Sequence, residues 1–249
     1  MNETPRKKES PRWNRFRDIV SRVWYVLFCV VVCLLITVWA VVLWRVVSES
    51  RGRWWLNRFE LYGFAAFFIL LAITFIFRRL KLSGTVYSNL HWAMRYTHEI
   101  THALFAFLFF RKIHRLNVDG RNSHVLYDNG PLGYLSITLS PYCVPIFTLM
   151  MLPWRFTVPD TGFRWKLFLL VIDAIIGFTY AFHVWCWCRQ TRRYQTDITG
   201  PGTVRSFLCI ALVHTVNLSL ILLTPRAGVA NALYRVFIEY PEQVLAMLK

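Results

Sequence analysis

The stretch RYTHEITHALFAFLFF, residues 95–110, places three costly polar side chains at the head of an apolar run. His98, Glu99 and His102 stand directly before eight apolar residues, 103–110. Ionisable side chains within a segment that crosses a membrane are expensive, and such groups usually serve a function. The stretch therefore predicts a helix at membrane depth with a polar site on one face.

The composition supports a membrane location. The chain has 249 residues, 56% of them hydrophobic, and a mean hydropathy of +0.39, too apolar for an ordinary soluble domain. Uncharged runs of spanning length lie at 23–44, 61–77 and 132–152, and runs interrupted by one or two ionisable residues lie at 167–188 and 206–224. With residues 90–110, which contain the polar motif, they make six candidate spans. We expect an all-α polytopic membrane protein with about six transmembrane helices and a small β-hairpin at the membrane edge.

The charge pattern predicts a lipid partner and an orientation. The net charge is +16, but Lys and Arg are spread over every loop, which favours lipid headgroup contacts over nucleic acid binding. Residues 1–22 form a basic segment, which is either a polar tail or an interfacial helix. The first apolar run is too long for the core of a cleaved signal, so we expect it to remain as an anchor. The side of the tail carries modestly more Lys and Arg, which places the N-terminus in the cytoplasm and the chain in the cytoplasmic membrane.

Residues that favour turns, and prolines that interrupt helices, follow the motif between residues 119 and 145. Asp119-Gly120 and Asn129-Gly130 are turn signals around short Val- and Tyr-containing stretches, and they predict a hairpin between spans three and four. A hairpin edge could pair with an extended peptide, whereas an ordinary polar loop would not. In the next span Pro141 and Pro145 each free a carbonyl about four residues earlier, which predicts a broken helix beside a wet cavity or a packing kink.

The spacing of His98, Glu99 and His102 is the H-E-x-x-H pattern. Residues four apart on a helix lie one turn above each other, so the two imidazoles can bind one tetrahedral zinc ion. The ion would lower the pKa of a bound water towards roughly 7, and Glu99 would take the proton of that water. A structural polar network without metal is the alternative.

The motif resembles that of the intramembrane zinc metallopeptidases of the site-2 protease type. The likeness extends through HEITHALFAFLFFRKIHRLNV, residues 98–118, in which a helix continues past the second histidine into a basic turn and a strand-like stretch. It covers about residues 90–200, and LSPYCVP, residues 139–145, stands where the family often has Ala-Gly-Pro. The resemblance implies a membrane-anchored protein substrate and a third metal ligand from span five or the loop after it.

The family's Leu-Asp-Gly element is missing, and three residues compete to be the third ligand. His183 is our first choice, because the helical rise puts it at a depth near that of the motif histidines. Asp197 is the second choice because its carboxylate matches the ligand type of the family, although its loop would have to fold back inwards. Asp173 is the third, as a group that orients an imidazole.

These observations predict four regions and one function. The regions are a basic tail (1–22), two accessory transmembrane helices (23–89), a metallopeptidase-like core (90–205), and a last transmembrane helix with an amphipathic C-terminal segment (206–249). The expected function is zinc-dependent intramembrane cleavage of membrane-anchored proteins, with Glu99 as general base and then acid. The alternative is a non-catalytic membrane protein, a scaffold or transporter, that uses the same cluster as a structural polar or metal site.

Overall fold

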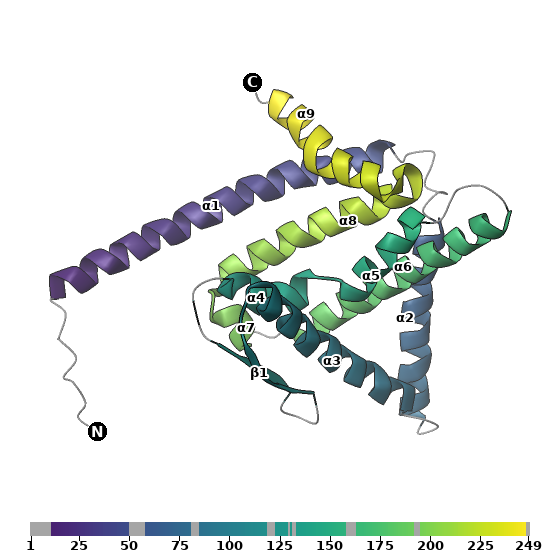
Figure 1. Ribbon diagram of the computed structural model, residues 1–249, viewed down its shortest axis with the longest axis horizontal. Helices are drawn as coiled ribbons and strands as arrows, with labels where there is room; N and C mark the ends of the chain where they lie inside the picture. Colours follow the sequence, from purple (N-terminus) through teal and green to yellow (C-terminus); the bar gives the residue numbers. More distant parts are fainter. Residues whose placement is uncertain are drawn as a thin grey trace.

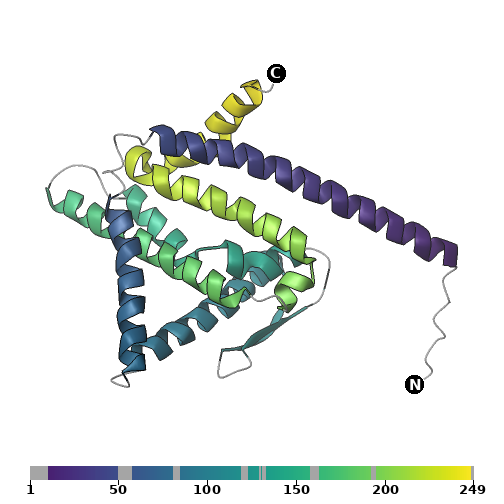
Figure 2. The ribbon, with the colours of Figure 1, turned by 180° about the vertical axis from the view of Figure 1, so that it is seen from behind.

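A computed structural model describes residues 11–49, 58–80, 85–118, 123–128, 130, 133–157, 163–191 and 195–247. The chain is mostly helical, with one two-stranded sheet (Figures 1 and 2). In chain order the elements are α1 (Pro11–Glu49), α2 (Arg58–Arg79), α3 (Thr85–Leu108), β1 (Ile113–Asn117), β2 (His124–Tyr127), α4 (Tyr134–Cys143), α5 (Ile146–Thr157), α6 (Phe163–Gln190), α7 (Thr196–Thr199), α8 (Thr203–Tyr234), a π-helical turn (Arg235–Glu239) and α9 (Tyr240–Met247).

Four of the described helical segments are long and apolar enough to cross a membrane, and the bent pair α4–α5 adds a fifth if it counts as one crossing. The four are Ile19–Ser48, Arg58–Arg79, Arg164–Gln190 and Thr203–Leu223. This is compatible with a multi-pass membrane protein, but the expected six spans are not confirmed. The missing one is the segment 90–110: α3 is a helix there, yet its polar motif face makes it less apolar than a spanning helix requires.

Two helix pairs build most of the bundle. Helix α1 runs along α8, and the N-terminal part of α1 extends beyond the other helices in both views (Figures 1 and 2). Helices α2 and α6 approach closely because each offers a glycine at the contact. A Cβ on Gly63 would lie 1.8 Å from the carbonyl oxygen of Ala174, and one on Gly177 would lie 1.9 Å from that of Glu60. Close packing through small residues is typical of membrane helices.

The predicted break in the fourth apolar run is present. Helices α4 and α5 meet at an angle of 75° around Val144 and Pro145. The carbonyls left free at the break find partners on α8: His214 Nε2 lies 2.9 Å from the oxygen of Tyr142, and Asn217 Nδ2 donates to that of Cys143 at 2.8 Å. Protein side chains therefore replace the lost helical bonds, as an apolar environment demands.

The predicted hairpin is also present. Strands β1 and β2 pair antiparallel, with Leu116 opposite Val125 and Asn117 opposite His124. The turn signal at 119–120 lies outside the described residues. In Figure 1 the hairpin lies near the C-terminal end of α3 and the short helix α7, so it is placed to line a site on that side of the bundle.

Both ends of the chain differ from the regions expected from sequence. Helix α1 begins at Pro11, within the expected tail of residues 1–22, and residues 1–10 lie outside the described part. Helix α8 continues past residue 224 to Tyr234, so the last apolar run and the C-terminal segment are not separated by a helix end. Apolar side chains of the C-terminal part, including Val236 and Tyr240, pack against α1, which explains why this helix continues.

Candidate metal centre

One face of α3 carries the polar motif. The pairs Arg95–Glu99 and His98–His102 are each four residues apart, and Arg95–His98 and Glu99–His102 are each three apart, so the four side chains share a face. Both histidines and Glu99 are buried. The polar residues expected from the sequence to form a site are therefore held inside the protein.

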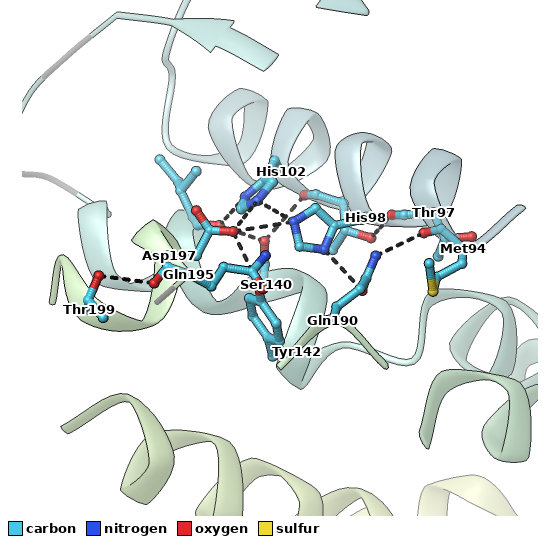
Figure 3. Close-up of polar contacts among 12 residues, drawn as sticks. Met94, Thr97, His98, His102, Ser140, Tyr142, Gln190, Gln195, Asp197 and Thr199 are labelled. Atoms are coloured by element: carbon cyan, nitrogen blue, oxygen red, sulfur yellow. Dashed lines mark hydrogen bonds and ion pairs between the residues drawn. The ribbon is translucent and has the colours of Figure 1, made fainter. Parts of the chain in front are cut away.

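Three ligand atoms converge beside this face (Figure 3). The Nε2 atoms of His98 and His102 lie 3.2 Å apart. Asp197 Oδ2 lies 3.3 Å from Nε2 of His98 and 3.6 Å from Nε2 of His102. In a tetrahedral zinc site with bonds of about 2.0–2.1 Å, neighbouring ligand atoms are separated by about 3.3–3.4 Å. The three distances fit three corners of such a tetrahedron.

The second nitrogen of each imidazole is fixed by an acceptor. His98 Nδ1 lies 3.1 Å from Oε1 of Gln190, whose Nε2 donates to the carbonyl of Met94. His102 Nδ1 donates to the carbonyl of Ile137 at 2.8 Å. These partners assign the proton to Nδ1 in both rings and leave a lone pair on each Nε2. Ligating histidines are commonly held in this way.

The carbonyl that holds His102 is free because of the proline break. Pro141 has no N–H, so it cannot make the helical bond to the carbonyl four residues earlier, which is that of Ile137. That oxygen accepts instead from His102 and from the Ser140 hydroxyl. The predicted proline effect thus acts directly on a motif histidine.

Asp197 reaches the histidines from the short helix α7. The backbone N–H of Thr199 and its hydroxyl both donate to the carbonyl of Gln195, which closes the turn. The Tyr142 hydroxyl donates to Asp197 Oδ2 at 3.2 Å and fixes the carboxylate. Burial alone would raise the pKa of Asp197, but a proton on the Nε2 side of His102 or His98 outweighs burial in the absence of an ion and keeps this pKa below its usual range. Asp197 is therefore an ionised ligand candidate.

The chemistry of this donor set suits a cation. Two lone pairs and a carboxylate oxygen facing one another repel unless a positive charge lies between them. A proton can bridge one pair of these atoms, whereas a metal ion can satisfy all three at once. The residues present therefore fit a zinc ion, with a fourth position left for water or substrate.

A cavity of about 360 Å³ opens onto this cluster. Glu99 lines it together with the three candidate ligands, and the Ser123–Val125 end of the hairpin forms another part of its wall. Within the described residues the Glu99 carboxylate has no hydrogen bond or ion pair. Neither α1 nor α2 contributes a described residue to the cavity wall. The arrangement offers an unengaged carboxylate, space and three ligand atoms in one place.

The structure places the first choice for the third ligand elsewhere. His183 is buried against His214, with the ring centroids 5.4 Å apart, and its Nε2 has no hydrogen-bond partner among the described residues. The depth argument assumed that α3 and α6 end at the same level, but α6 ends at Gln190 beside His98, so His183 lies about 10 Å away from the level of His98 at the helical rise. Gln190, and not His183, is the residue of α6 that is level with His98.

Asp173 is also remote from the cluster. Its carboxylate accepts from Arg155 Nε at 2.9 Å, and both side chains are nearly buried. The ion pair joins α5 to α6, and Asp173 does not line the cavity that contains the motif histidines. His183 shares a small second cavity with His98, but of the three competitors only Asp197 brings a ligand atom to both motif histidines in the described residues.

Two residues that hold the cluster were not expected from the sequence. Gln190 and Tyr142 contact His98 and Asp197 respectively. Tyr142 stands between the two prolines in LSPYCVP, so its place at the break was a usable signal. Gln190 ends an apolar helix and carries no pattern that points to a metal site.

Comparisons with known proteins give no relative. No family model, curated protein or solved structure matches the chain significantly.

Proposed function

We propose that the chain is a zinc-dependent endopeptidase that cleaves membrane-anchored proteins at or within the membrane. The observation that carries the proposal is the approach of two imidazole Nε2 atoms and the Asp197 carboxylate at tetrahedral distances, beside a buried Glu99 that faces the same cavity. The H-E-x-x-H spacing supports the same chemistry. The likeness to site-2-type peptidases is part of this proposal.

His98, His102 and Asp197 would hold the ion, and Gln190, Ile137 and Tyr142 would orient them. Bound zinc would supply Lewis-acid activation of water and of the scissile carbonyl. Glu99 would take the proton of the attacking water and return it to the nitrogen of the leaving amine. Burial suits this task, because a site shielded from bulk solvent strengthens electrostatic interactions with the developing charge.

The hairpin gives the proposal a substrate surface. Ser123, His124, Val125 and Tyr127 line the cavity, so strand β2 lies along the route that a bound chain would take. An extended segment could pair with the free edge of β2 by backbone hydrogen bonds. A transmembrane helix would have to unwind near the site to present such a segment.

The topology remains part of the proposal. We propose that α3 lies at membrane depth as the sixth crossing element, covered by α4, α6 and the hairpin, and that the N-terminus is cytoplasmic in the cytoplasmic membrane. The polar face of α3 then points into the protein and the cavity, and its exposed apolar residues, such as Leu104 and Phe107, point outwards.

The substitution Glu99→Gln tests the proposal. It keeps the shape of the side chain but removes the base, so the variant should fold, retain zinc and lose cleavage of a membrane-anchored reporter by at least 100-fold. Cleavage would be measured in vesicles, and zinc by elemental analysis of the same samples. Activity within about threefold of wild type would remove Glu99 from its role.

The non-catalytic alternative gives a different outcome. A scaffold or transporter that uses the cluster as a structural metal site would bind zinc equally well in wild type and Glu99→Gln, and neither protein would cleave any reporter. Loss of zinc by Asp197→Ala would then lower stability without any change in proteolysis.

A further inference from the structure

Arg95 lines the cavity, and no acid among the described residues forms an ion pair with it. It lines the cavity with Glu99 and the three candidate ligands, and it lies one helical turn before His98 and Glu99 on α3. Its Nε is buried and has no hydrogen-bond partner among the described residues. A buried donor that remains unpaired costs free energy, so a partner that arrives with a ligand would be favoured.

Glu99 does not serve as that partner. Arg95 and Glu99 are four residues apart, but no ion pair forms between them in the described structure. An arginine N-terminal to a glutamate is the less favourable order for such a pair on a helix. The other acid in the cavity, Asp197, is engaged by the two histidines and Tyr142. The Arg95 guanidinium therefore remains available to an anion.

The charge balance of the cavity points the same way. With a divalent ion at the three ligands, the two carboxylates are neutralised and the charge of Arg95 is left over. A guanidinium recognises a carboxylate through two parallel hydrogen bonds, a stronger and more directional contact than a lysine makes.

We propose that Arg95 binds a carboxylate of the substrate, two or three residues from the scissile bond. This inference rests on the proposed function. The helical rise puts Arg95 about 4.5 Å before His98 along α3, and helical side chains lean towards the N-terminus, which adds a few ångströms. An extended chain advances about 3.3 Å per residue, which gives the stated spacing. The carboxylate belongs to an Asp or Glu side chain or to a chain end.

Hydroxamate peptides separate these cases. A hydroxamate binds zinc through two oxygens and fixes one end of the probe at the metal. Three probes would share a backbone: one has Glu as its third residue and an amide terminus, one has Gln there instead, and one is a tripeptide with a free terminal carboxylate. Dissociation constants would be measured on zinc-loaded protein of the full chain, with Arg95→Met and Arg95→Lys as variants. Arg79→Met, which removes a surface charge outside the cavity, is the matched control.

The wild type should bind the Glu probe or the free-carboxylate probe at least about tenfold more tightly than the Gln probe, the size expected of a charge-assisted pair. The better probe identifies the source of the carboxylate. Arg95→Met should remove this preference while keeping zinc and affinity for the Gln probe, Arg95→Lys should keep part of it, and Arg79→Met all of it.

Equal binding of the three probes by wild type, or a preference that persists in Arg95→Met, would overturn the role of Arg95 and leave the zinc peptidase intact. Failure of wild type to bind any hydroxamate would overturn the zinc site, and this inference with it.

Discussion

At the scale of single residues, the site depends on groups that hold the ligands as much as on the ligands. His98 is oriented by Gln190, His102 by the Ile137 carbonyl and Asp197 by the Tyr142 hydroxyl. Each contact fixes one tautomer or one carboxylate position before any ion binds. The conformational entropy of these side chains is therefore largely lost on folding, and little more would be lost when an ion binds.

Gln190 allows a direct test of this scheme. Gln190→Leu removes the acceptor for His98 Nδ1, so zinc affinity should fall about 10–100-fold, the range for a partner of a ligand. Gln190→Glu keeps an acceptor at the same place and should retain most of the affinity. Competition with a chelator of known affinity measures both. If Leu and Glu weaken zinc equally, the hydrogen bond to His98 does not contribute.

The sequence identified only part of this site. The motif predicted His98, Glu99 and His102, because helical spacing alone places them on one face. Depth could not rank the three candidates for the third ligand, since the level at which α6 ends relative to α3 is set by helix packing that the apolar pattern does not reveal. The fold of the loop that carries Asp197 is set by contacts such as that of Ser206 with Ile198, which no local pattern reveals.

At the scale of elements, the break between α4 and α5 links a proline to a candidate metal ligand. Pro141 leaves the Ile137 carbonyl free for His102. The sequence predicted the broken helix and the freed carbonyl, because both follow from the missing N–H of proline. It did not predict which side chain would take that carbonyl.

Pro141→Ala should therefore weaken the metal site without destroying the fold. The restored N–H competes with His102 Nδ1 for the Ile137 oxygen, so zinc affinity should fall about 10-fold or more. Pro153→Ala makes the same change inside α5, away from the cavity, and should leave zinc affinity unchanged. Equal zinc affinity in Pro141→Ala and wild type would show that the proline does not position His102.

At the scale of the whole molecule, the packing of α2 against α6 helps to position the site, because it places the end of α6. Gly177 allows α6 to approach the backbone of α2 closely, and α6 ends at Gln190 beside His98. The hydrophobic runs predicted these helices. They did not predict that α2 pairs with α6, because the pairing depends on which glycines lie at the contact, and the apolar pattern does not show this. Likewise, the sixth span is not confirmed, because the polar face of α3 makes this helix less apolar than the other candidate spans.

Gly177→Leu should destabilise the protein and weaken zinc binding together. The added side chain would force α2 and α6 apart, because its Cβ alone would overlap the Glu60 carbonyl oxygen. Val171→Leu, on an exposed face of the same helix, is the control and should change neither property. Thermal unfolding in detergent and zinc content would be followed in parallel. A Gly177→Leu protein as stable as the control would contradict this packing.

The most direct test of the central claim is the zinc content per chain of purified wild type beside Asp197→Ala and His183→Ala. The account predicts one zinc in wild type and in His183→Ala, and loss of zinc in Asp197→Ala at matched chelator concentration. No zinc in wild type after exposure to the ion, or loss in His183→Ala with retention in Asp197→Ala, would contradict it.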